Sequence, residues 1–128
     1  MEIQQWTCPI LVIDDDNDLC DILEVIIRKH CPVHFEHDLK SAGNYLTKVK
    51  PEIIFLDNNL PDGIGLLYIK TILHFCPDVK IILMTSDQSI GIKELAMEEG
   101  ATNFIEKPFK ARMINEMILE ICPNLRAA

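Results

Sequence analysis

Short runs of apolar, β-branched residues alternate along this chain with longer segments in which apolar residues recur at helical spacing. Ile10–Ile13 and Ile53–Leu56 are unbroken apolar runs, and an aspartate follows each of them directly. An unbroken run indicates a strand buried on both faces, because a strand with one solvated face would alternate apolar and polar residues. Such strands need helices on both sides of their sheet, so the pattern predicts a layered α/β domain.

Five strand–helix units follow one another, and 128 residues are too few for two ordinary domains. Consecutive units of this kind require parallel strands and right-handed crossovers. We therefore predict one α/β domain over residues 8–123, a doubly wound five-stranded parallel sheet with helices on both faces. The expected strands are Ile10–Ile13, Val33–His37, Ile53–Leu56, Val79–Met84 and Asn103–Ile105, and the inward helical stripes include Leu19, Ile22, Leu23, Leu39, Leu46, Val49, Ile92, Leu95, Ala96, Met113 and Ile114.

The segment Val33–His37 alternates apolar and polar residues, which predicts a strand near an edge of the sheet. Asp38 follows it and is expected to cap the next helix.

The formal net charge is −8, which argues against nucleic-acid binding by this domain, because phosphate contacts need clustered lysine and arginine. Residues 1–7 do not have the pattern of a secretory signal, and no apolar stretch approaches the roughly 20 residues of a membrane-spanning helix. We therefore expect a soluble, cytoplasmic domain that does not contact a membrane.

Five widely spaced cysteines include no C-x-x-C pair, so zinc or redox chemistry is not indicated. We expect them to be reduced thiols that mostly pack in the interior. Four histidines lack metal-ligand spacing and are expected to lie away from the acidic residues.

Polar residues gather where the predicted strands end. Asp14, Asp15, Asp57, Thr85 and Lys107 all fall at or just after carboxyl ends of strands. In doubly wound sheets, ligands bind outside those ends. The topology therefore predicts that these five residues, which are far apart in sequence, converge on one rim of the sheet.

Three aspartates on one rim need a cation, because a like-charged pair at 4 Å costs roughly 4 kcal/mol at an effective dielectric of about 20. Mg²⁺ fits best, since it uses few carboxylates and bridges to phosphate oxygens. Lys107 adds a second positive charge. With the charge neutralised, Asp57 is suited to attack phosphorus, and the Thr85 hydroxyl can donate to an arriving phosphoryl oxygen.

The chain resembles the receiver domain of bacterial response regulators from Ile10 through the last helix. The resemblance implies a flavodoxin-like sheet with strand order 2-1-3-4-5 and a domain that accepts a phosphoryl group from a sensor histidine kinase or phosphotransfer protein. Such a domain promotes its own phosphorylation and dephosphorylation and is not a turnover enzyme. The motifs that carry the likeness are Leu11–Asp16, Asp57–Gly63, Met84–Ser86 and Phe104–Phe109.

Residue roles follow from the same resemblance. Asp57 would be the phosphoacceptor, and Lys107, joined to Pro108 by a cis bond, would contact the phosphoryl group. Thr85 and Phe104 would form a switch that reshapes the face made by the fourth helix, fifth strand and fifth helix, which selects a partner or a second copy of the chain. The implied Mg²⁺ ligands are Asp15 and Asp57 directly, Asp14 through water, and the backbone carbonyl of Asn59.

Two residues depart from the commonest pattern of the family: Asn58 stands where an apolar residue is usual, and Phe104 where tyrosine is frequent. Two alternatives stay open. One is a phosphohydrolase of the haloacid dehalogenase type, of which Asp14–Asp18 fits only half the motif. The other is a degenerate receiver that binds partners without phosphorylation, although such modules usually lack one of the reacting groups. The sequence names neither the stimulus nor the output.

Overall fold

The computed structural model describes residues 7–86 and 91–123, and within them the predicted alternation of strands and helices is present. Five of the ten predicted strand ends agree with the observed ones, and the other five differ by one residue. The main-sheet strands are β1 (Ile10–Ile13), β2 (Val33–Glu36), β3 (Ile53–Asp57), β6 (Lys80–Thr85) and β7 (Asn103–Glu106), and the helices are α1 (Asn17–Ile27), α2 (Leu39–Leu46), α3 (Gly65–Phe75), α4 (Ile92–Glu99) and α5 (Ala111–Ile121).

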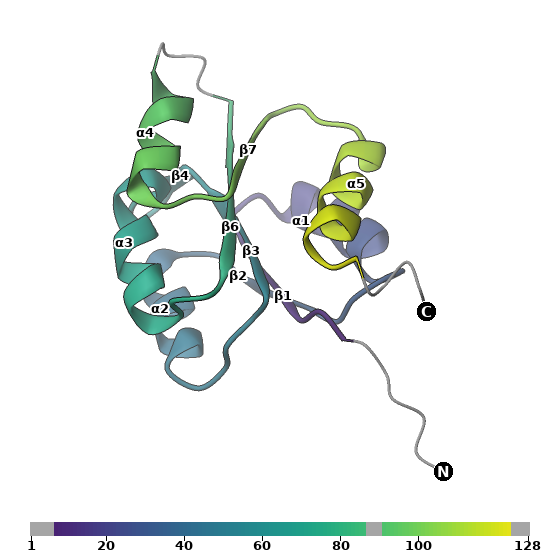
Figure 1. The fold of residues 1–128 in the computed structure, drawn as a ribbon, viewed down its shortest axis with the longest axis horizontal. Coiled ribbons are helices and arrows are strands. Elements are labelled where there is room, and N and C mark those ends of the chain that lie inside the picture. Colours follow the sequence, from purple (N-terminus) through teal and green to yellow (C-terminus); the bar gives the residue numbers. More distant parts are fainter. Residues whose placement is uncertain (1–6, 87–90, 124–128) are drawn as a thin grey trace.

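The five strands pair in parallel in the order β2-β1-β3-β6-β7, which is the predicted order 2-1-3-4-5 counted within this sheet. Helices α2, α3 and α4 cover one face, and α1 and α5 cover the other (Figure 1). The doubly wound fold expected from the sequence is therefore confirmed.

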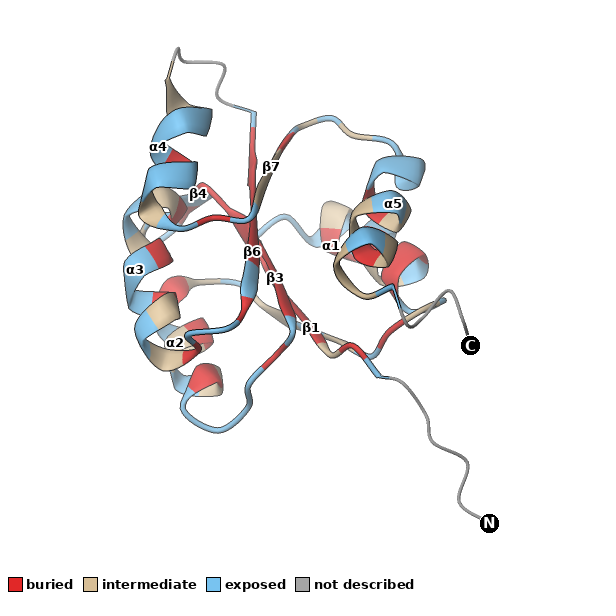
Figure 2. Cartoon of the chain, viewed as in Figure 1, coloured by how far each residue is buried: buried red, intermediate tan, exposed pale blue. Residues whose placement is uncertain are grey.

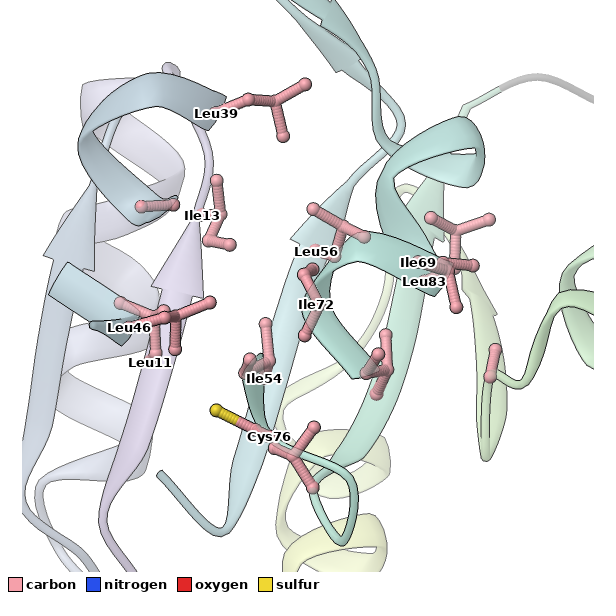
Figure 3. Packing of buried hydrophobic residues seen from close by; sticks show 14 of the residues in the cluster. Leu11, Ile13, Leu39, Leu46, Ile54, Leu56, Ile69, Ile72, Cys76 and Leu83 are labelled. Carbon is pink, nitrogen blue, oxygen red and sulfur yellow. The ribbon is translucent and has the colours of Figure 1, made fainter. Parts of the chain in front are cut away.

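Side chains that alternate along each central strand supply two separate hydrophobic clusters, because successive strand residues point to opposite faces. Leu11 and Ile13 of β1 pack toward α2 and α3, whereas Ile10 and Val12 pack toward α1 and α5. Figure 3 shows the first cluster, in which the strand residues meet Leu46 of α2 and Ile69 and Ile72 of α3. Strands β1 and β3 are buried along their whole length, and β6 is buried after its first residue, Lys80 (Figure 2).

Four residues expected to point inward are instead substantially exposed. In α1, Leu23, Ile26 and Ile27 already occupy the side that faces the sheet, and α4 packs mainly through the small side chain of Ala96. A narrow contact leaves the neighbouring apolar residues of the same helix in solvent, and Val49 lies beyond the end of α2. The relative exposures are 55% for Ile22, 50% for Leu95, 39% for Met113 and 36% for Val49.

Strand β2 lies at an edge of the sheet, as its alternating sequence predicted, and among the described strands it pairs only with β1. The next helix begins as expected too, because the Asp38 side chain accepts a hydrogen bond from the Ser41 N–H at 2.7 Å.

A two-stranded antiparallel ribbon follows β3 and was not predicted from the sequence. It consists of β4 (Asn59–Leu60) and β5 (Gly63–Ile64). Only Pro61 and Asp62 separate the two strands, and antiparallel strands can be joined by so short a connection.

Cys8 and Cys122 form a disulfide, so the expectation of five reduced cysteines was wrong for this pair. Their Cα atoms lie 6.7 Å apart although 114 residues separate them. Sequence spacing cannot show this proximity, which arises because α5 packs over the start of β1 in the second hydrophobic cluster. Cys20, Cys31 and Cys76 are free and buried, as predicted.

No helix within residues 7–86 and 91–123 has the length and apolarity to cross a membrane.

Candidate functional site

The carboxyl ends of four neighbouring strands carry the predicted site residues. Asp14 follows β1, Asp57 ends β3, Thr85 ends β6 and Lys107 follows β7. The register pairs Ile13 with Leu56, which places the two aspartates at adjacent strand ends. The predicted convergence on one rim is therefore confirmed, and parallel strand order is its cause.

Asp14, Asp15 and Asp57 form an acidic cluster in which one carboxylate oxygen from each residue lies within 4.8 Å of the others. Asp14 and Asp57 are buried at 1% and 5% exposure, and Asp15 is exposed. Three oxygen ligands of this kind suit a hard divalent cation such as Mg²⁺ or Ca²⁺. The donor set thus fits the metal that the sequence predicted, with Asp15 on the side open to solvent.

Lys107 reaches across the rim and neutralises part of this charge. Its Nζ donates to Asp14 Oδ2 at 2.8 Å and to Asp57 Oδ1 at 3.0 Å. Burial lowers the Lys107 pKa, but these two hydrogen bonds and the two negative charges outweigh that effect and raise it. The ammonium group is therefore held in its charged form. The Lys107–Pro108 peptide bond is cis, as predicted.

The pKa of Asp57 is raised, chiefly because burial penalises the carboxylate and also because the Asp14 charge lies nearby. Hydrogen bonds from Lys107 and from the Asn59 backbone N–H act in the opposite direction without cancelling the shift. A nucleophilic carboxylate has to be ionised, so a cation bound beside Asp57 would favour its reactive form. Asn59 begins β4 two residues after Asp57, and its role as a carbonyl ligand stays a prediction.

Thr85 and Phe104 lie on adjacent strands, as the sequence predicted. Thr85 is fully buried at the end of β6, and its backbone carbonyl accepts from the Lys107 N–H at 2.9 Å. Phe104 pairs with Leu83 in the register of β6 and β7 and is partly buried against the first hydrophobic cluster. The motion assigned to the pair stays a prediction.

His37 contacts this site, so the expectation that the histidines lie away from the acids was wrong for this residue. Its ring Nδ1 lies 2.9 Å from the backbone carbonyl oxygen of Asp14. The physical reason is that β2 runs parallel to β1, so the residue that follows β2 comes to the same rim as the residue that follows β1. The alternating strand pattern that ends at His37 could have predicted that this residue lies at the carboxyl end of a strand.

Asn58, the departure from the usual family pattern, has a structural role beside the site. It is buried at 5% exposure, and its Oδ1 accepts from the Leu66 N–H at 3.0 Å in the first turn of α3. Ile64, at the N-cap position, offers no side-chain hydrogen bond. Asn58 therefore caps α3 from a distance. The lack of a capping residue type directly before α3 was the sequence feature that could have indicated such a remote cap.

Gly65 and Asp62 also support the rim, and neither was predicted from the sequence. A Cβ at Gly65 would collide with the backbone carbonyl oxygen of Asp57, so only glycine lets α3 begin this close to the acid. Asp62 accepts from the Leu39 N–H at 2.8 Å and the Lys40 N–H at 3.0 Å, which ties the β4–β5 turn to the start of α2.

A groove with a volume of about 410 Å³ opens beside Lys107, between α1 and the segment that leads from β7 into α5. Its floor is mostly apolar, and it reaches the charged rim at Asp16 and Lys107. Its lining residues are Asp16, Leu19, Ile22, Ile26, Ser86, Lys107, Pro108, Phe109 and Ala111.

The family model of the response regulator receiver domain matches this chain over residues 10–119. This span includes every residue of the rim and most of both hydrophobic clusters.

Solved structures of such proteins resemble this chain closely. A response regulator from Burkholderia pseudomallei, with a phosphorylated aspartic acid, a calcium ion and citrate, is 26% identical with a TM-score of 0.80, covering 94% of this chain and 71% of that one. The beryllofluoride-activated NtrC4 receiver domain dimer is 26% identical with a TM-score of 0.85, covering 91% and 98%. A CheY-like receiver domain protein from Methanospirillum hungatei, 22% identical with a TM-score of 0.86 and covering 95% and 98%, supports the fold.

Proposed function

The chain belongs to the response regulator receiver domain family, and from this membership we propose that Asp57 accepts a phosphoryl group from a sensor histidine kinase or a phosphotransfer protein. The observation that carries the proposal is the placement of Asp57 within one acidic cluster and in contact with the Lys107 ammonium. The phosphorylated aspartic acid in the Burkholderia pseudomallei relative supports the same chemistry.

A divalent cation is needed for this step, and we propose Mg²⁺ held directly by Asp15, Asp57 and the Asn59 carbonyl, with Asp14 contributing through water. The ion would neutralise charge on the transferring phosphoryl group. The Asp57 carboxylate then attacks phosphorus while the bond to the donor breaks. Lys107, already shared between Asp14 and Asp57, stabilises the negative charge on the phosphoryl oxygens. The calcium ion in the structure from Burkholderia pseudomallei shows that this relative binds a hard divalent cation.

Phosphorylation would act as a switch through Thr85 and Phe104. The Thr85 hydroxyl donates to the phosphoryl group only in the modified state, which supplies the differential free energy that a population shift requires. Moving an equilibrium from 1:99 to 99:1 takes about 5.5 kcal/mol, whereas one charge-assisted hydrogen bond provides roughly 1.5–3 kcal/mol. Contacts of Lys107 and burial of the Phe104 ring would add to it. The α4-β7-α5 face would then change shape.

That face is the proposed site for an output partner or for a second copy of the chain. The NtrC4 relative, a dimer in its beryllofluoride-activated form, supports the second possibility. We place the domain in the cytoplasm, away from membranes, and do not assign it direct nucleic-acid binding.

The phosphohydrolase alternative needs a second acid two residues after Asp14, which is the position of Asp16. In the structure Asp16 instead caps a helix. Its Oδ1 accepts from the Leu19 N–H at 3.2 Å as the N-cap of α1. Asp16 does not belong to the acidic cluster. This geometry supports a phosphoacceptor that is not a turnover enzyme.

The proposal is tested by incubating the protein with acetyl phosphate and Mg²⁺ and measuring intact mass and released phosphate. We expect at most one added phosphoryl group per chain, no labelling with EDTA, and none in Asp57→Asn. Asp16→Asn, which alters a nearby acid outside the cluster, should still be labelled. Hydrolysis of a stable phosphomonoester over many turnovers would instead support the phosphohydrolase.

A further inference from the structure

The backbone carbonyl of Asp14 receives two hydrogen bonds from side chains of different elements. His37, which follows β2, approaches through Nδ1 at 2.9 Å, and Cys20, in α1, through Sγ at 3.4 Å. A carbonyl oxygen only accepts, so Nδ1 must carry the ring proton and the sulfur must be a thiol. Both side chains therefore act as donors to one atom.

The thiol of Cys20 is buried at 6% exposure. Burial first, and then the charges of Asp14, Asp16 and Asp21, raise its pKa to about 12. Strand β2 ends at Glu36, and the Glu36 carbonyl accepts from the Asp14 N–H at 3.0 Å as the last rung of the ladder. Past this rung, the side chains of His37 and Cys20 donate to the Asp14 carbonyl in place of a strand N–H.

Holding this carbonyl fixes the orientation of the acidic pair. The peptide between Asp14 and Asp15 is planar, so restraining its oxygen restrains the whole unit and the direction in which the Asp15 side chain leaves it. The Asp14 side chain is restrained separately, since its Oδ1 accepts from the Asp16 N–H and its Oδ2 from Lys107. Groups that orient metal ligands from behind in this way commonly change affinity 10- to 100-fold when removed.

We propose that His37 and Cys20 are positioning residues that hold the Asp14–Asp15 peptide in the orientation required for Mg²⁺ binding. This inference rests on the proposed Mg²⁺ site. Neither side chain contacts the ion in this proposal, and each acts only through the Asp14 carbonyl.

The test compares variants that keep a donor with variants that remove it, using isothermal titration with Mg²⁺ alone. His37→Asn keeps an N–H at the position of Nδ1, and Cys20→Ser keeps a donor at the position of Sγ. We expect these two to bind nearly as wild type does. His37→Leu and Cys20→Ala should weaken Mg²⁺ binding about 10-fold. Because the two donors share one acceptor, their effects in the double variant should not be additive.

Matched controls separate positioning from general loss of structure. His30 bonds through its ring to Asn115 of α5, and Cys31 is a buried free thiol whose pKa is raised by burial alone. His30→Leu and Cys31→Ala should therefore leave Mg²⁺ affinity unchanged. Urea unfolding of every variant confirms that titrations are made on folded protein.

Wild-type affinity in both His37→Leu and Cys20→Ala would overturn the inference while leaving the Mg²⁺ site intact. Equal weakening in the donor-keeping variants or in the two controls would also overturn it, because the effect would then not depend on the donor. If the wild-type protein bound no Mg²⁺, or if Asp15→Asn bound Mg²⁺ as tightly as the wild type, the proposed site itself would fail, and the inference with it.

Discussion

The middle of each central strand and its carboxyl end bury different kinds of side chain. Ile53–Leu56 in β3 is completely buried and wholly apolar, with side chains divided between two hydrophobic clusters. One residue later the chain buries the Asp57 carboxylate, and Asp14 and Thr85 are buried at the neighbouring ends. The interior gains stability from apolar burial, whereas the rim holds charges that burial disfavours. Substitutions in the strand interiors should therefore mainly lower stability, whereas substitutions on the rim should mainly affect phosphorylation.

The largest change in stability is expected in the interior. Phe55 is fully buried among the residues under α1 and α5, so Phe55→Ala removes a large side chain from a closed cluster. We expect a loss of about 3–5 kcal/mol in the free energy of unfolding, measured by urea denaturation. Leu67→Ala, at 73% exposure, should change it by less than about 0.5 kcal/mol. A small effect for Phe55→Ala would mean that this cluster is loosely packed.

Reduction of the Cys8–Cys122 disulfide should produce the next largest effect. The bond closes nearly the whole chain into one loop, and a native disulfide typically stabilises by about 2–4 kcal/mol. Urea unfolding with and without reductant measures the difference. Cys122→Ser should abolish the response to reductant. Finding five titratable thiols in the unreduced, denatured protein, rather than the three free cysteines seen here, would contradict the pairing.

On the rim, added Mg²⁺ should stabilise the protein only when Asp57 is intact. A ligand at about 100 times its Kd stabilises the folded state by about 2.7 kcal/mol. Thermal unfolding should therefore show a higher Tm with Mg²⁺ for the wild type and little change for Asp57→Asn. An equal rise in both proteins would place the ion elsewhere.

Without metal, Asp57→Asn should instead stabilise the folded protein relative to the wild type. The raised pKa of Asp57 means that folding disfavours its carboxylate, so wild-type stability falls as pH rises from the ordinary aspartate pKa through the raised one. Asp57→Asn has no such group to ionise and should lack this part of the fall. Urea unfolding in EDTA measures the free energy of unfolding of both proteins across this pH range. If this free energy falls equally with pH in the two proteins, the expectation is wrong.

The smallest effect concerns the cap that connects the rim to α3. Asn58→Ala removes the side-chain oxygen that accepts from the Leu66 N–H, and a lost cap typically costs about 0.5–2 kcal/mol. Asp38→Ala, which removes the cap of α2, offers a comparison of similar size. If Asn58→Ala were neutral while Asp38→Ala was not, the remote cap would contribute nothing measurable.

The doubly wound parallel sheet and the rim were predictable from periodicity and strand ends, whereas the strand order came from the family resemblance. Asp14, Asp57, Thr85 and Lys107 each follow or end a recognisable strand, and parallel strands bring such ends together. The family resemblance supplied what periodicity could not, including the cis bond before Pro108.

Contacts between side chains distant in sequence were not recoverable in this way. The Cys8–Cys122 pairing depends on how α5 lies over β1, and the contact of His37 with Asp14 depends on where β2 ends. The exposure of Ile22 and Leu95 reflects how narrow each helix–sheet contact is, which helical periodicity does not specify.

The most direct test of a rim built for phosphoryl transfer is to locate the modified residue. Wild-type protein treated with acetyl phosphate and Mg²⁺ would be trapped by borohydride reduction, which converts aspartyl phosphate to homoserine, and mapped by peptide mass spectrometry. We predict homoserine at position 57 alone. Homoserine at position 14, 15 or 62, or no modification in protein shown to bind Mg²⁺, would contradict the assignment of Asp57 as the phosphoacceptor.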